Sequence, residues 1–179
     1  MSKQDAYAHV LESMKALVED QRNWVCNTAN ASSLMWHMFH SLERPSSAVN
    51  WAGFYVVDKR DPSQLILGPF HGKVACQTIK IGSGVCGTVA MNGSSLVLED
   101  VETFPGHIAC DGDSKSEVVV PIAVDGKVGG STSLEVFVLT MWQVVGVIDI
   151  DCAELKGFDD DDRKGLERLA NLLADCCDW

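Results

Sequence analysis

The stretch WAGFYVVD, residues 51–58, marks the point at which the sequence changes from helical to strand-like patterning. Short runs rich in valine, isoleucine and aromatic residues begin here, and such runs separated by turn-forming residues are typical of strands. The runs are WAGFYVVD (51–58), QLILGPF (64–70), ACQTIKI (75–81), SLVLED (95–100), SEVVVPIAV (116–124) and VVGVIDID (144–151). We therefore expect six strands in one sheet.

Helical patterns lie on both sides of these runs. Residues 5–19 place Val10, Leu11 and Met14 on one face. A second helix is expected to begin at Asn27, a residue type that caps helices well, and to end before Pro45. The C-terminal stretch DDDDRKGLERLANLLADCC (159–177) opens with acids that suit a helix N-terminus. Helices that bracket an antiparallel-looking sheet predict an α+β fold.

Composition limits the classes of function. A chain of 179 residues, 46% apolar and 22% charged, has the size and balance of one globular domain, so we expect residues 1–179 to form a single domain. The formal net charge of −11 argues against binding to nucleic acid or to an anionic membrane surface. With no signal peptide and no run of 18 apolar residues visible, we expect a cytoplasmic protein.

One segment has no obvious place in a simple hairpin. GGSTSLEVFVLTMWQ (129–143) follows the turn signal Asp125-Gly126 and precedes the last strand-like run. It is strongly β-prone and nearly uncharged, so we expect it to pack on something. It could extend both arms of a hairpin, form a lid or cover a partner's surface.

Seven cysteines, at positions 26, 76, 86, 110, 152, 176 and 177, are many for a cytosolic chain, in which thiols are more often catalytic or redox-active than structural. Their spacing contains no CxxC pair, which argues against a zinc ribbon. Cys26, Cys152 and Cys176 lie in or beside apolar segments and are expected in the core. A helix start beside Cys86 and the loop around Cys110 would each favour a thiolate.

Five stretches together carry a resemblance to a known family. NWAGFY, GPFHGKVACQTI, GSGVCGTVA, EDVETFPGHIACDGDSKSEVVVPI and VVGVIDID follow one another in this order. Over about residues 50–158 the chain resembles the GAF-domain free methionine-(R)-sulfoxide reductases. The resemblance implies a GAF-like six-stranded antiparallel sheet flanked by N- and C-terminal helices. It also implies reduction of free L-methionine-(R)-sulfoxide to methionine through a cysteine sulfenic acid and an intramolecular disulfide.

The same resemblance assigns roles to residues. Cys110 would be the nucleophile, Cys86 the resolving cysteine, and Cys76 a second or alternative one. A sulfoxide oxygen leaves well only when protonated, and Glu117 or Asp151 would supply the proton. The remaining contacts would be an aromatic wall, a carboxylate for the substrate ammonium and loop N–H groups for its carboxylate: Trp51, Tyr55, Asp149, Ile108 and Ala109.

The resemblance implies no metal and no bound cofactor, and it names thioredoxin or another dithiol as the reductant. It also allows a homodimer formed through the terminal helices. His107 lies three residues before the expected nucleophile, and we favour a solvated loop residue over a proton donor. The alternative function is a non-catalytic GAF domain that senses a small ligand or redox state.

Overall fold

The computed structural model describes residues 2–108, 112–125 and 142–179. Six antiparallel strands form one sheet in the order β3-β2-β1-β6-β5-β4. The strands are β1 (Val49–Val57), β2 (Gln64–Gly72), β3 (Thr78–Lys80), β4 (Leu96–Leu98), β5 (Ser116–Asp125) and β6 (Trp142–Cys152). The predicted α+β fold with a six-stranded antiparallel sheet is confirmed.

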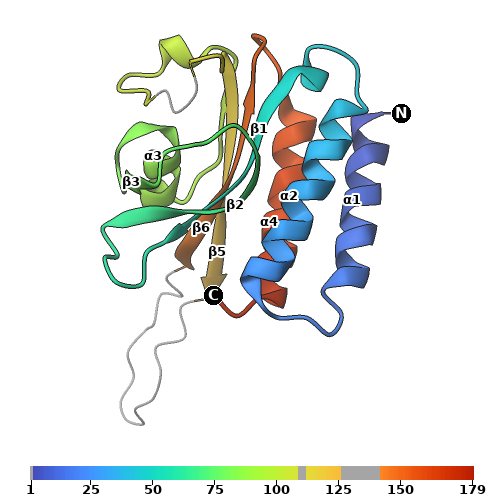
Figure 1. The fold of residues 1–179 in the computed structure, drawn as a ribbon, viewed down its shortest axis with the longest axis vertical. Coiled ribbons are helices and arrows are strands. Elements are labelled where there is room, and N and C mark those ends of the chain that lie inside the picture. The colour runs from blue at the N-terminus through green and yellow to red at the C-terminus, as the bar shows by residue number, and fades with distance from the viewer. Residues whose placement is uncertain (1, 109–111, 126–141) are drawn as a thin grey trace.

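Three long helices cover one face of the sheet (Figure 1). They are α1 (Lys3–Leu17), α2 (Trp24–His40) and α4 (Asp160–Cys176). The opposite face carries α3 (Gly84–Asn92), and two 3₁₀ turns, Ser46–Ala48 and Val101–Thr103, lie before β1 and after β4. The two ends of the sequence thus form one layer, and the middle of the sequence builds the other side.

Alternation along the central strands divides the core in two, because successive side chains of a strand point to opposite faces. Ala52 and Phe54 of β1, with Ile148 and Ile150 of β6, pack beneath the helices. Their neighbours Trp51, Tyr55, Val119 and Val147 pack with α3 on the other face. That second cluster is smaller, and it leaves room for polar groups among its apolar side chains.

The helix boundaries correct one expectation. Asn23, not Asn27, caps α2, because its Oδ1 accepts a hydrogen bond from the Cys26 N–H at 3.0 Å. Asn27 lies inside the helix, fully buried, and donates from Nδ2 to the Gln21 carbonyl at 2.8 Å. The helix therefore begins one turn earlier than the sequence suggested.

Two of the three cysteines expected in the core are not fully buried. Cys152 is completely buried, as predicted, whereas Cys176 is half-buried at the core's edge. Cys26 is exposed, so its predicted burial is wrong. It lies in the first turn of α2 and faces away from the stripe that packs on the sheet.

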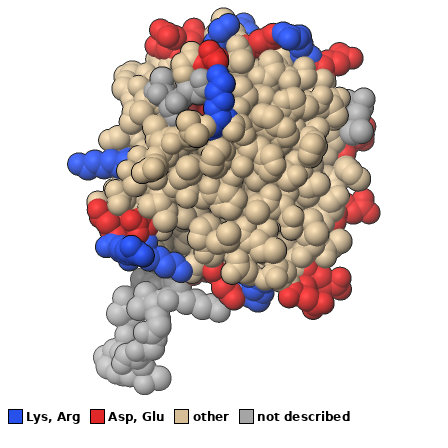
Figure 2. Space-filling model, in the orientation of Figure 1, with Lys and Arg blue, Asp and Glu red and all other residues tan. Residues whose placement is uncertain are grey.

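Charged side chains are unevenly distributed on the surface. On the face shown in Figure 2, charged side chains lie mainly around the rim, with basic and acidic groups often adjacent, and uncharged residues fill the centre. No helix among the described residues is long and apolar enough to cross a bilayer.

Asp125 of β5 pairs with Trp142 of β6. The predicted insertion at 129–143 falls outside the described residues except for its last two residues, Trp142 and Gln143, which begin β6.

Candidate active site

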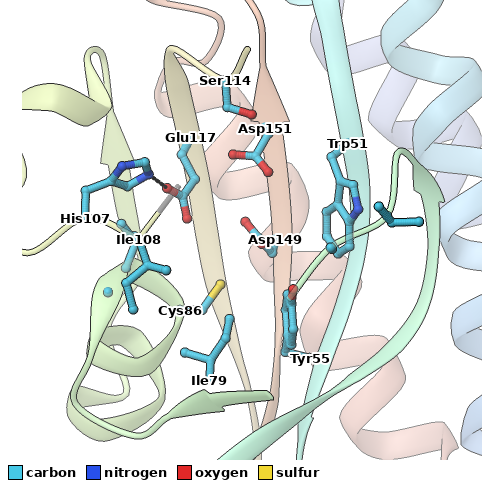
Figure 3. A pocket seen from close by; sticks show the side chains of 14 residues that line it. Trp51, Tyr55, Ile79, Cys86, His107, Ile108, Ser114, Glu117, Asp149 and Asp151 are labelled. Carbon is cyan, nitrogen blue, oxygen red and sulfur yellow. Dashed lines mark ion pairs between the residues drawn. The ribbon is translucent and has the colours of Figure 1, made fainter. Parts of the chain in front are cut away.

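A single cross-strand row supplies three side chains to one pocket on the α3 side of the sheet. Asp151 of β6 is paired with Trp51 of β1 on one side and with Glu117 of β5 on the other. Asp149 lies two residues further along β6, where it pairs with Gly53 and Val119. Since residues two apart on a strand share a face, the pocket receives three carboxyl groups and an indole (Figure 3).

The glycine at position 53 leaves room for the Trp51 indole beside Phe70. A Cβ atom at this position would be 2.3 Å from Cβ of Phe70 and 2.7 Å from Cη2 of Trp51. The absent side chain lets Trp51 stack between Tyr55 and Phe70, with ring centroids 5.8 Å and 5.2 Å away. The three rings form a rigid apolar wall opposite the carboxyl groups. Sequence reasoning missed Gly53, although a glycine inside a strand often marks a close approach of this kind.

Cys86 enters the pocket from the first turn of α3. Its side chain is buried, and burial together with the neighbouring Asp149 and Glu117 carboxylates raises the pKa of its thiol well above the ordinary value. The prediction of a thiolate at Cys86 is therefore wrong. The helix N-terminus favours a negative charge, but burial beside two acids outweighs it.

Two of the three carboxyl groups, those of Glu117 and Asp149, are buried, and Asp151 is partly exposed. Burial raises the pKa of Glu117 to about 7, opposed by a hydrogen bond from His107 and reinforced by the charge of Asp151. Burial and the charge of Glu117 raise the pKa of Asp149 as well. One oxygen of each of these two carboxyl groups and the Cys86 Sγ lie within 4.8 Å of one another. The pocket therefore holds protons on groups that would be fully ionised in water at neutral pH.

His107 faces Glu117 rather than solvent. Its Nε2 is 3.5 Å from Oε2 of Glu117, and its side chain is only 17% exposed (Figure 3). The hydrogen bond to Glu117 raises the pKa of the imidazole. The expectation of a solvated loop residue is wrong, because a turn closed by the hydrogen bond from the His107 N–H to the Phe104 carbonyl is followed by side chains, His107 and Ile108, that line the pocket.

Two buried polar atoms in the pocket have no hydrogen-bond partner among the described residues: Nε1 of Trp51 and Oδ1 of Asp149. Unpaired buried groups cost free energy, and a bound ligand can supply the missing partners. Nε1 of Trp51, on β1, is a donor, and Oδ1 of Asp149, on the adjacent strand β6, is an acceptor. The pair matches a ligand that carries both a polar acceptor and a cationic donor.

The structure brings most of the predicted site residues together. Trp51, Tyr55, Cys86, Ile108, Glu117, Asp149 and Asp151 all line the pocket. Cys76 lies in the loop before β3 rather than on the strand predicted at 75–81, beside the lining residues Val74 and Ala75. The Tyr55 hydroxyl donates to its carbonyl oxygen at 3.0 Å. Ala109 and Cys110 lie outside the described residues.

The described cysteines are in two states. Cys76 is disulfide-bonded. Cys86 is a free thiol, as are Cys26, Cys152, Cys176 and Cys177. A disulfide at the rim, a protonated acid and an aromatic wall are the parts that thiol-based reduction of a small polar molecule requires.

Known proteins share this sequence and architecture. A family model described as GAF domain matches residues 28–177. The free methionine-R-sulfoxide reductase of Saccharomyces cerevisiae is 47% identical over 178 residues, which cover 99% of this chain and 88% of that protein. The free methionine-R-sulfoxide reductase of Escherichia coli is 36% identical over 97% of this chain and 89% of its own length.

A solved structure of the free methionine-R-sulfoxide reductase from Neisseria meningitidis in complex with its substrate is also similar. It superposes with a TM-score of 0.79 at 34% identity, over 98% of this chain and 90% of that one. Because the match covers 98% of this chain, the likeness extends over both layers of the fold.

Proposed function

Because the chain belongs to the GAF-domain free methionine-(R)-sulfoxide reductase family, we propose that it reduces free L-methionine-(R)-sulfoxide to methionine with electrons from a dithiol. The observation that carries the proposal is Glu117, a buried carboxyl whose pKa is raised to about 7 within a pocket walled by Trp51 and Tyr55. A sulfoxide needs a proton on its oxygen as that oxygen leaves, and a carboxyl that keeps its proton near neutral pH can supply it.

In the proposed reaction the Cys110 thiolate attacks the sulfoxide sulfur while Glu117, or Asp151 beside it in the cross-strand row, protonates the oxygen. The oxygen passes to the cysteine sulfur, methionine leaves, and Cys110 becomes a sulfenic acid. A second thiol then attacks the sulfenic sulfur, and water leaves as a disulfide forms. An external dithiol reduces that disulfide and restores both thiols.

The states of the cysteines support Cys76 as the second thiol. Cys76 is disulfide-bonded and sits at the edge of the pocket, whereas Cys86 is free, buried and held protonated by its acidic neighbours. A thiol is a poor nucleophile until it ionises, so Cys86 is less suited to attack. This assignment reverses the order that the resemblance implied for Cys86 and Cys76.

The residues that line the pocket also account for the proposed substrate selectivity. Asp149 offers its unpaired oxygen to the α-ammonium group, and loop N–H groups near Ile108 and Ala109 are placed by sequence to meet the α-carboxylate. Trp51 and Tyr55 would pack on the methyl group. A pocket that satisfies both termini of an amino acid excludes a peptide, because a peptide has neither charge to give and would leave Asp149 unpaired.

The compartment and the partners belong to the same proposal. Five of the described cysteines are free thiols, which suits the reducing cytosol, and we propose thioredoxin or another dithiol protein as the reductant. We also propose one domain over residues 1–179 and a homodimer formed through the terminal helices.

The decisive experiment assays purified protein with a dithiol reductant on four substrates: each sulfoxide epimer of methionine, free and within a short peptide. We expect turnover of the free R epimer alone, abolished by Cys110→Ser. Equal turnover of the peptide-bound R epimer would contradict the pocket argument. Binding of the free sulfoxide without methionine production would replace the enzyme with a GAF sensor.

A further inference from the structure

We infer that the pocket is also a binding site for a thiophilic divalent cation such as Zn²⁺, held by Cys86, Glu117 and Asp149, and that the cation reversibly blocks the pocket. Only the blocking of activity rests on the proposed function. Binding of the cation is a separate property of the three side chains.

The geometry supplies the three ligands. The Cys86 Sγ and one carboxylate oxygen each from Glu117 and Asp149 lie within 4.8 Å of one another, and all three side chains are buried. Around Zn²⁺, with bonds of about 2.3 Å to sulfur and about 2.0–2.2 Å to oxygen, tetrahedral ligands lie roughly 3.3–3.8 Å apart. Small side-chain rotations from the observed positions close the remaining distance.

A second observation points to a cation independently of this spacing. Oδ1 of Asp149 is buried, with the residue 6% exposed, and has no hydrogen-bond partner in the described part of the chain. It belongs to a pocket whose described lining contains three carboxyl groups but neither lysine nor arginine. Glu117, Asp149 and Cys86 hold protons between them in the free pocket, and a cation that displaces those protons would give this oxygen a partner.

His107 fits the outer shell of such a site. It contacts Oε2 of Glu117 at 3.5 Å, which leaves Oε1 to turn toward Cys86 and Asp149 (Figure 3). Carboxylates that bind metals are often held by a second hydrogen-bonding group in this way. A water molecule would complete the tetrahedral coordination.

The donor set selects the class of ion. A thiolate with two carboxylates favours Zn²⁺ or Co²⁺ over Mg²⁺ and Ca²⁺, which prefer oxygen alone. The cysteine spacing gave no hint of this site, because its other two ligands are acids on β5 and β6. Cys86 releases its proton to solvent when it binds the ion. A bound ion would occupy the position that Asp149 and Glu117 offer to substrate, so it would compete with methionine sulfoxide.

The test uses Co²⁺ as a coloured probe of the protein in its disulfide form, in which Cys86 is the free thiol among the described residues of the pocket. Titration should produce a thiolate-to-cobalt charge-transfer band in the near ultraviolet and visible bands typical of tetrahedral cobalt. Zn²⁺ should abolish both. Cys86→Ser and Cys86→Ala should lose the charge-transfer band, and Glu117→Gln or Asp149→Asn should weaken affinity by at least about tenfold.

Matched variants keep the result interpretable. Cys152→Ser, in the core beneath the helices, and Cys26→Ser, on the exposed side of α2, should leave the titration unchanged. Circular dichroism should show that the Cys86 variants are folded. A charge-transfer band that survives in folded Cys86→Ala, or no band in the unmodified protein, would overturn the inference.

The activity arm separates this inference from the proposed function. Zn²⁺ should inhibit methionine sulfoxide reduction competitively, and a chelator should restore the activity. Cobalt binding at Cys86 without any reductase activity would remove the proposed function and leave the metal site. Full reductase activity with no cobalt bands would remove the metal site and leave the proposed function.

Discussion

His107 and Glu117 face each other at the edge of the pocket, with the imidazole Nε2 3.5 Å from the carboxylate Oε2. Burial of Glu117 favours its protonated form, and the hydrogen bond and charge of His107 favour its ionised form. Glu117 in turn raises the pKa of His107. The two groups therefore compete for a proton, and in the proposed reaction His107 would adjust how readily Glu117 gives its proton to the substrate.

The first prediction concerns the pH dependence of kcat/KM. If Glu117 is the acid, activity falls as pH rises through the pKa of Glu117, about 7 in the free protein. His107→Gln removes a positive charge that lowers this pKa, so the alkaline limb of the profile should move to higher pH. The profile of kcat/KM for the free R sulfoxide, compared with that of the exposed-surface variant His40→Gln, measures the shift. An unmoved limb would mean that His107 does not act through Glu117.

The second prediction concerns Asp149 and the substrate ammonium group. Asp149→Asn should reduce kcat/KM by roughly 10- to 150-fold, the loss expected for a hydrogen bond to a charged group of about 1.5–3 kcal/mol. A substrate analogue without the amino group supplies the control. The unmodified protein should handle this analogue poorly, and Asp149→Asn should impose little further loss on it. An equal loss on both substrates would place the effect of Asp149 elsewhere than at the ammonium group.

The strand-borne part of the site could be predicted from the sequence, because alternation along a strand fixes which side chains share a face. Asp149 and Asp151 are two residues apart on one strand, and Glu117 lies on its neighbour. The resemblance to a known family then gave these positions their roles. Alternation alone could not show that this face holds a pocket. The space for the Trp51 ring depends on the absence of a side chain at Gly53.

Loop-borne features and electrostatics were harder to predict. The contact between His107 and Glu117 depends on how the 104–108 segment folds back, and no local pattern encodes that path. The shift in the pKa of Cys86 was predicted in the wrong direction, because it arises from burial and from acids on strands distant in sequence. The sequence showed the helix start beside Cys86 but not the strands that pack against that residue.

The third prediction separates the Tyr55 hydroxyl from its ring. Tyr55→Phe keeps the stacking on Trp51 but removes the hydrogen bond to the Cys76 carbonyl, which ties the loop before β3 to the sheet. We expect the burst of methionine in a single turnover to be unchanged and the following disulfide formation to be slower. Rapid-quench mass spectrometry resolves the two steps. A slower methionine burst with normal disulfide formation would instead assign the hydroxyl to the substrate.

The fourth prediction tests the helical layer on the far side of the sheet. Gly165 of α4 lies against the Tyr7 ring of α1, and a Cβ atom there would be 2.3 Å from Cγ of that ring. The Tyr7 hydroxyl also donates to the buried Asp162 at 3.2 Å, so the ring cannot move aside without straining that bond. Gly165→Ala should therefore lower the free energy of unfolding by about 1–3 kcal/mol, even though alanine is the better helix former.

Urea unfolding measures the effect of Gly165→Ala, and Asn171→Ala on the exposed side of the same helix is its matched control. The control should be neutral or slightly stabilising, because it gains helix propensity without a clash. KM for the sulfoxide should stay unchanged in both variants, since the pocket lies on the opposite face of the sheet. An unfolding midpoint for Gly165→Ala equal to that of the unmodified protein would show that α1 and α4 can separate freely. The helical layer would then be a looser support for the strands that carry Glu117 and Asp149.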